Sequence, residues 1–422
     1  MMSSSEILLG MGLTLLLAMA SQLVALKVRV PGIVVLLPVG FVAGHFLTSL
    51  NLRPALGAAY APLVSLAVAM ILFDGGLELV FKDVAGQLHG VVRRLQTIGV
   101  AITAAGGTAL ALVVLHLDWR TALMFGVMVV VSGPTVVGPL LAFARPGRNA
   151  SLVLGWEGTT VDAIGAILAA VVYAGFVHPH AIGIIGDVGA FFLSVSVGLA
   201  GAALAIGILW LLLTRIKLGG VMATQVIVMT VVGTAGLCDA VRDDTGLIAA
   251  IVIGIAFANL PGLDMPEDRT FFATIVQLVV GVLFISIASS VPFGSVSAVL
   301  LPTVVVVAAL VLVVRPLVVG IVTLRTTLTW QERVFIAWMH PRGIIAAATA
   351  ASFGVGLTSV GIAGASTLLP SIFLVILCTV AVYGLSASHV ARLLGLQVSK
   401  VDQQAVAATL PDRPAAAAAD EG

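Results

Sequence analysis

The chain has 422 residues, of which 60% are hydrophobic and only 9% are charged, and its mean hydropathy is +1.20. Soluble globular proteins carry many more charged groups on their surfaces, so this composition excludes them and indicates a polytopic helical membrane protein. The formal net charge is +1 and the sequence has no basic tract, so we expect no nucleic-acid partner.

Apolar segments of about 20 residues, the length that crosses a bilayer, recur along the chain. After the third segment, residues 81–95 mix charged and apolar side chains and predict a short amphipathic helix on the cytoplasmic face. The tail over residues 397–422 is polar and then rich in Ala and Pro, so we expect it to be disordered. The segment lengths and the breaker residues predict thirteen spans, over residues 6–26, 31–50, 58–80, 95–117, 120–143, 150–175, 188–214, 219–239, 244–260, 270–291, 296–323, 330–354 and 366–394.

Basic residues are distributed unequally between the two sides of the predicted spans. Loops after odd-numbered spans, together with the tail, hold fifteen of the twenty Lys and Arg residues, and loops after even-numbered spans hold three. The positive-inside rule places the basic loops in the cytoplasm, so the N-terminus is predicted outside and the C-terminus inside. We expect a multi-pass protein of the cell (inner) membrane.

The sixth span carries two carboxylates, Glu157 and Asp162, and acids at membrane depth indicate a functional site. A spacing of five residues turns a helix by about 500°, so the two side chains point roughly 140° apart. Gly158 and Thr159 share the helix face of Asp162, which is therefore predicted to face a small polar pocket. Glu157 then needs its own partner. The alternative is that both acids are structural, bonded to the backbone or to buried arginines.

Spans five and twelve contain helix breakers in mid-membrane. Span five reads Ser132-Gly133-Pro134-Thr135, and span twelve reads His340-Pro341-Arg342-Gly343. Unwound backbone at this depth is tolerated only where it lines a cavity or is buried in protein. Two broken helices at corresponding places in two halves indicate a transport site at the interface of inverted repeats, here spans four to six and eleven to thirteen.

Three further charged residues stand out in the predicted spans. Arg315 lies in the middle of span eleven and either pairs with a carboxylate, for which Glu157 is the candidate, or extends to the membrane interface. Arg342 either offsets the partial negative charge of a half-helix C-terminus or also extends to the interface. Asp74, near the cytoplasmic end of span three, is either a solvated acid or part of a funnel that attracts cations.

Together these motifs resemble the monovalent cation:proton antiporter family, specifically its NhaP-type sodium/proton exchanger branch. The resemblance covers nearly the whole membrane region and implies an all-α fold of about 13 membrane helices, with two broken crossing helices in a six-helix core. It implies core helices over residues 95–175 and 296–396, and scaffold and dimer helices over residues 6–94 and 183–291. A homodimer and elevator movement of the core are further expectations. The resemblance rests on Phe73-Asp74-Gly75-Gly76-Leu77, Ser132-Gly133-Pro134-Thr135, Glu157-Gly158, Asp162, Arg315 and Arg342-Gly343.

The resemblance also implies roles for individual residues. Asp162 would bind sodium or a proton, and Glu157 would contribute to the site and pair with Arg315. Ser132, before the break in span five, would help to hold the ion. Arg342 corresponds to the arginine of the broken span-twelve motif.

The sequence departs from the family pattern at two places. Many members have asparagine before the key aspartate, where this chain has Val161, and many have Thr-Asp-Pro where this chain has Ser132-Gly133-Pro134. Both differences reduce the number of polar groups near the ion.

These features predict a secondary transporter, not an enzyme, in which a monovalent cation and a proton compete for Asp162. The transported ions are its substrates, and we expect no resident cofactor. Because Val161 cannot titrate, we expect electroneutral one-for-one exchange. The alternatives are a sodium-coupled symporter of an organic anion, a non-transporting membrane sensor or assembly subunit, and an ion channel.

Overall fold

The computed structural model describes residues 4–28, 30–77, 79–83, 87–177, 183–216, 218, 220–242, 245–263 and 269–397. All regular secondary structure in these residues is helical, which confirms the predicted fold class. The predicted tail lies outside the described residues from position 398 onward.

Each of the thirteen predicted spans is occupied by helix. Eight helical stretches are long and apolar enough to cross a membrane, and five shorter apolar helices, α2, α4, α8, α12 and α17, accompany them among the described residues. The chain is therefore a multi-pass membrane protein. Its first half contains α1 (Ser4–Val28), α2 (Gly32–Phe46), η1 (Thr48–Leu50), α3 (Leu52–Leu56), η2 (Gly57–Ala59), α4 (Tyr60–Leu77), η3 (Phe81–Asp83), α5 (Gln87–Arg94), η4 (Leu95–Gly99), α6 (Val100–Val113), α7 (Trp119–Met128), α8 (Pro134–Ala144), α9 (Arg148–Val177) and α10 (Gly183–Trp210). The second half contains η5 (Leu211–Arg215), α11 (Gly220–Val241), α12 (Thr245–Asn259), α13 (Arg269–Ser289), α14 (Phe293–Ala309), η6 (Leu310–Val314), α15 (Arg315–Val322), α16 (Trp330–Trp338), α17 (Ile344–Ser359), η7 (Ala365–Thr367) and α18 (Leu368–Leu393).

The predicted amphipathic segment, residues 81–95, contains η3 and α5, with residues 84–86 outside the described part of the chain. Residues 87–94 are helical as α5, but this helix continues without interruption through the π-helical turn η4 into α6. The residues therefore extend the fourth span. Two further π-helical turns are described, η5 at the end of α10 and η6 in the eleventh span, immediately before Arg315. Extra residues in a helical turn change the direction of the side chains that follow, and such turns are frequent at functional sites.

Both broken helices have a polar N-cap followed by a tryptophan. The carboxylate of Asp118 accepts a hydrogen bond from the backbone N–H of Arg120 at the start of α7. Thr329 forms a reciprocal capping box with Glu332 at the start of α16. Such caps satisfy backbone donors that a helix leaves unpaired. The caps fix where each half-helix starts, and the Gly and Pro residues fix where it ends.

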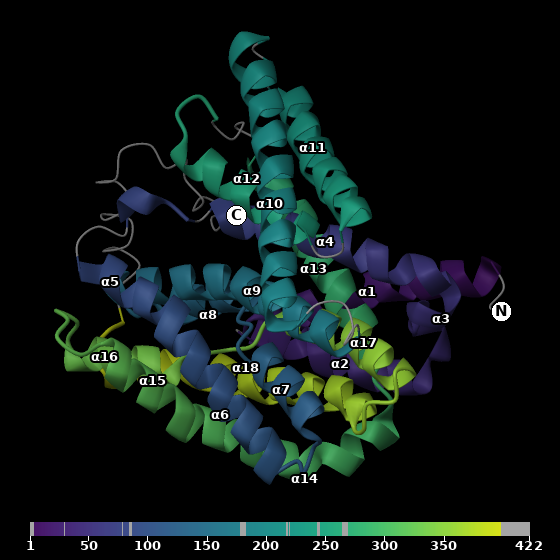
Figure 1. The fold of residues 1–422 in the computed structure, drawn as a ribbon, viewed down its shortest axis with the longest axis vertical. Coiled ribbons are helices and arrows are strands. Elements are labelled where there is room, and N and C mark those ends of the chain that lie inside the picture. Colours follow the sequence, from purple (N-terminus) through teal and green to yellow (C-terminus); the bar gives the residue numbers. More distant parts are fainter. Residues whose placement is uncertain are drawn as a thin grey trace.

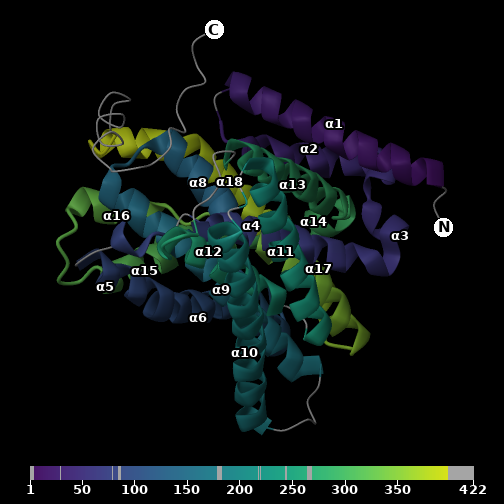
Figure 2. The ribbon, with the colours of Figure 1, turned by 90° about the horizontal axis from the view of Figure 1, so that it is seen from above.

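The two broken helices and α9 meet in the middle of the molecule (Figure 1). Helix α9 contacts α7, α8, α16 and α17, and α18 contacts α8 and α17. Helix α4 packs closely on α12, where a Cβ atom placed on Gly76 would lie 2.7 Å from the carbonyl oxygen of Ile251. Small residues let membrane helices approach this closely. Helix α10 projects from the remaining helices, and α1 lies along an outer edge (Figure 2).

Candidate functional site

Asp162 lies where the two broken helices cross. Its side chain is only 1% exposed, and it projects from the continuous helix α9 toward the breaks. A Cβ atom placed on Gly133 would lie 3.1 Å from its Oδ2, and one placed on Gly343 would lie 3.4 Å from its Oδ1. The carboxylate is thus in contact with both breaks. Among the described residues, its Oδ1 has no hydrogen-bond partner.

Two helix N-termini point toward this carboxylate. Gly133 is the N-cap of α8 and Gly343 is the N-cap of α17, and neither helix has a side-chain cap. The unpaired N–H groups at a helix N-terminus carry partial positive charge and favour an anion. The crossing therefore places the partial positive charge of two helix N-termini beside Asp162.

The two breaks touch through their glycines. A Cβ atom placed on Gly343 would lie 2.6 Å from the backbone nitrogen of Gly133 and 2.8 Å from its Cα. These atoms belong to the backbone and cannot rotate away. The crossing geometry therefore depends on glycine at position 343.

We expect Gly343→Ala to abolish the activity of the site while leaving most of the fold intact, because the methyl group forces the two half-helices apart beside Asp162. Gly138→Ala is the matched control, since a Cβ atom there meets nothing within 4 Å. Cation-dependent proton flux in proteoliposomes measures the effect. Flux equal to that of the wild type in Gly343→Ala would contradict this geometry.

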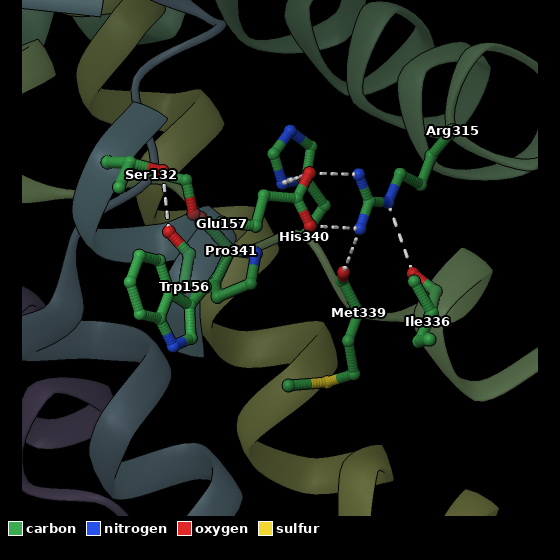
Figure 3. A network of polar contacts seen from close by, with 9 residues as sticks. Ser132, Trp156, Glu157, Arg315, Ile336, Met339, His340 and Pro341 are labelled. Carbon is green, nitrogen blue, oxygen red and sulfur yellow. Dashed lines mark hydrogen bonds and ion pairs between the residues drawn. The ribbon is translucent and has the colours of Figure 1, made fainter. Parts of the chain in front are cut away.

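Glu157 forms the expected ion pair with Arg315 (Figure 3). Its Oε1 and Oε2 accept hydrogen bonds of 2.5 and 2.7 Å from Nη1 and Nη2 of Arg315. Both side chains are buried, so Arg315 does not extend to the membrane interface. Bidentate pairing is the strongest geometry that these two groups can form. Glu157 and Asp162 thus have different surroundings: Glu157 is paired with Arg315, and Asp162 lies beside the two breaks.

Arg315 also bonds the end of the half-helix α16. Its Nε donates to the carbonyl oxygen of Ile336 and its Nη2 to that of Met339, each at 3.1 Å. These carbonyls carry the partial negative charge of a helix C-terminus. The sequence assigned that charge to Arg342, so this contact of Arg315 was not predicted.

Arg342 lies in the break between α16 and α17 and is only 3% exposed, which rules out extension to the interface. Among the described residues, its Nε and Nη1 have no hydrogen-bond partners. Arg342 therefore adds positive charge to the crossing region without forming a fixed ion pair of its own there.

His340 belongs to the same cluster, although the sequence analysis gave it no role. Its Nδ1 lies 3.9 Å from Oε1 of Glu157, and its side chain is buried (Figure 3). Its place within the broken motif, two residues before Arg342, was the available signal. The Arg315 guanidinium and the His340 imidazole therefore flank one carboxylate.

The hydroxyl groups near the crossing have different surroundings. Ser132 donates a 2.9 Å hydrogen bond to the carbonyl oxygen of Pro341, which joins the two breaks (Figure 3). Thr159 donates within its own helix to the carbonyl oxygen of Gly155, at 3.1 Å. Thr135 differs from both, since its buried Oγ1 has no hydrogen-bond partner among the described residues.

The remaining predicted residues lie beside this cluster. Val161 is buried in a small apolar cluster with Val100 and Val130, so no polar group replaces the asparagine of the family pattern. Asp74 precedes Gly75 on α4, where a Cβ atom would lie 2.8 Å from Cγ of Pro134 and 3.1 Å from Cγ2 of Thr159. Helix α4 therefore packs against the start of α8 at Gly75.

Among the described residues, no three His, Cys, Asp or Glu side chains gather as ligands for a metal ion. The donors available at the crossing are the Asp162 carboxylate, hydroxyl groups and the carbonyl groups of unwound backbone. Such oxygen donors suit hard cations, and unwound carbonyls coordinate sodium in other transporters.

Comparison with known proteins agrees with this architecture. Two solved structures of the sodium proton antiporter MjNhaP1 from Methanocaldococcus jannaschii superpose on nearly the whole chain. The structure at pH 8 has 19% sequence identity and a TM-score of 0.75, and covers 91% of this chain and 100% of that one. The electron-microscopy structure has 21% identity and a TM-score of 0.76, and covers 94% and 100%. At these identities the likeness establishes the fold.

The family comparison is independent of these structures. A comparison with curated proteins finds no match. The sequence model described as "Sodium/hydrogen exchanger, transmembrane" matches residues 12–393, which is most of the chain and includes both broken helices and α9. The resemblance inferred from the sequence motifs is confirmed, and the chain belongs to the sodium/hydrogen exchanger family.

Proposed function

We propose that this protein exchanges sodium, or another monovalent cation, for protons, and that the two ions bind in competition at Asp162. The observation that carries the proposal is a buried carboxylate at the crossing of two broken helices, with one oxygen that has no hydrogen-bond partner among the described residues. A buried charge without a counter-ion is costly. Binding of either a cation or a proton relieves that cost.

Competition at one carboxylate is sufficient for coupling. With a cation or a proton bound, Asp162 is neutral, and the site can move through the low-dielectric barrier. Without either ion, the cost of moving the bare anion holds the site in place. Each cycle then carries a cation one way and a proton the other.

The proposed movement is of the elevator type. Residues 95–175 and 296–396 would form the moving core together with α5, which is continuous with α6, and residues 6–83 and 183–291 would form the scaffold and the contacts of a homodimer. Support comes from the contacts of α9 with both broken helices and of α18 with α8 and α17, which link the site to one group of helices. The N-terminus would lie outside and the C-terminus in the cytoplasm of the cell membrane. Asp74 would lie on the cytoplasmic side of the site and attract cations toward it.

The proposal is tested with purified protein in liposomes that contain a pH-sensitive dye. A proton gradient is imposed, and sodium, potassium and lithium are added in turn. Recovery of dye fluorescence with at least one cation supports exchange and identifies its selectivity. No response to any of them in well-folded protein would overturn the proposal and favour a symporter or a sensor.

We expect this exchange to be electroneutral. Asp162 is the only titratable group that the mechanism uses, and its neighbour Val161 is packed in an apolar cluster and cannot carry a second proton. One cation would therefore replace one proton. Transport currents in reconstituted protein should match those of empty vesicles, whereas a cation-dependent current that varies with membrane potential would contradict this stoichiometry.

A further inference from the structure

We propose that the hydroxyl group of Thr135 is a ligand of the transported cation, in place of the Ser132 hydroxyl that the sequence suggested. This inference rests on the proposed function, because it concerns the ion that binds at Asp162. It assigns Thr135 a binding role in addition to its place in the broken helix.

The position of Thr135 follows from the local sequence. Gly133 is the N-cap of α8, Pro134 is its first residue and Thr135 is its second. A Cβ atom placed on Gly133 would lie 3.1 Å from Oδ2 of Asp162 and 3.5 Å from Oγ1 of Thr135. Because residue 133 is glycine, no side chain separates these two oxygens. The hydroxyl and the carboxylate therefore border the same small space.

The second observation concerns the hydrogen bonds of the Thr135 hydroxyl and the Asp162 carboxylate. Among the described residues, neither Oγ1 of Thr135 nor Oδ1 of Asp162 has a hydrogen-bond partner, although both atoms are buried. Buried polar groups in proteins are normally satisfied, so an unsatisfied hydroxyl beside a carboxylate whose other oxygen is also unsatisfied requires an explanation. A cation between them would supply the missing interaction for both.

The other hydroxyl groups are less suitable. The hydroxyl of Ser132 is directed at the carbonyl oxygen of Pro341, a contact that holds the two breaks together. The hydroxyl of Thr159 is directed back at its own helix. Both groups therefore have a structural explanation that needs no ion, whereas Thr135 has none.

The test measures cation binding and exchange in four proteins: wild type, Thr135→Val, Thr135→Ser and Thr303→Val. Valine keeps the shape of threonine and removes the hydroxyl, and serine restores it. Thr303 on α14 is the matched control, because its Oγ1 is also buried and has no partner among the described residues. Thermal unfolding of each variant shows whether it is folded, and Thr135→Ala replaces the valine variant if that one is not.

We expect Thr135→Val to raise the half-saturating cation concentration about tenfold, the effect of losing one polar contact to a charged group, with little change in the maximal rate. Thr135→Ser and Thr303→Val should behave like the wild type. Unchanged cation affinity in Thr135→Val would overturn the inference while leaving the proposed function standing.

Calorimetry measures cation binding in the absence of transport, so it tests the role of Thr135 separately from the exchange activity. If the wild type binds cations without exchanging protons, the proposed function fails and the binding data alone decide the role of Thr135. If the folded wild type binds no cation, both proposals are overturned.

Discussion

Asp162→Asn is expected to reduce cation-dependent proton flux to the level of empty liposomes. The amide has nearly the same shape as the carboxylate, but it can neither release a proton nor neutralise a cation. The variant should fold, because the wild-type side chain forms no ion pair and has an unpartnered oxygen among the described residues. Dye-loaded liposomes with an imposed proton gradient measure the loss.

The matched control is Asp118→Asn at the start of α7. Asp118 is exposed, and the amide oxygen of asparagine can still accept the capping hydrogen bond from the N–H of Arg120. This control should exchange ions at the wild-type rate. Substantial exchange in Asp162→Asn would remove that residue from the mechanism.

Arg315→Ala is expected to have the largest effect on stability. Removing one partner of a buried ion pair typically costs about 3–5 kcal/mol, because the other charge remains buried without compensation. Here Glu157 would lose both hydrogen bonds, and the carbonyls of Ile336 and Met339 would lose theirs. We expect a clearly lower melting temperature in detergent. Arg315→Lys should be intermediate, since it keeps the charge but loses the planar fork.

Arg94→Ala is the control for this effect. Arg94 also bonds two backbone carbonyls, those of Val322 and Leu324, but it is exposed and these bonds join it to no carboxylate. Its removal should change the melting temperature little. The double variant Glu157→Gln/Arg315→Met should recover part of the lost stability, because it leaves neither member of the pair as an uncompensated buried charge. Equal melting temperatures for Arg315→Ala and Arg94→Ala would show that the buried pair does not stabilise the fold.

The sequence predicted the spans and the main features of the site because membrane constraints act on local patterns. Apolar length and breaker residues located the helices, and the rarity of buried charge identified Glu157, Asp162 and Arg315. Helical spacing alone separated the two acids, and in the structure Glu157 pairs with Arg315 while Asp162 lies at the crossing of the broken helices. The family comparison confirms the resemblance that these motifs carried.

Other features depend on three-dimensional contacts that no local pattern encodes. The bonds of Arg315 to the end of α16 arise because α15 and α16 pack together. The different states of the Ser132 and Thr135 hydroxyls depend on how the two breaks cross. The continuity of α5 with α6 was also not predicted, because the mixed charged and apolar residues of the segment 81–95 indicated only a short amphipathic helix on the cytoplasmic face.

Proton release on cation binding tests the central claim most directly. Purified protein in weakly buffered detergent solution, with a pH indicator, receives sodium at a pH where the site is partly protonated. If both ions compete for Asp162, cation binding to the wild type and to Asp118→Asn releases protons in proportion to the protonated fraction of the site, and Asp162→Asn releases none. Cation binding without proton release in the wild type, or equal release from Asp162→Asn, would contradict a shared site at this carboxylate.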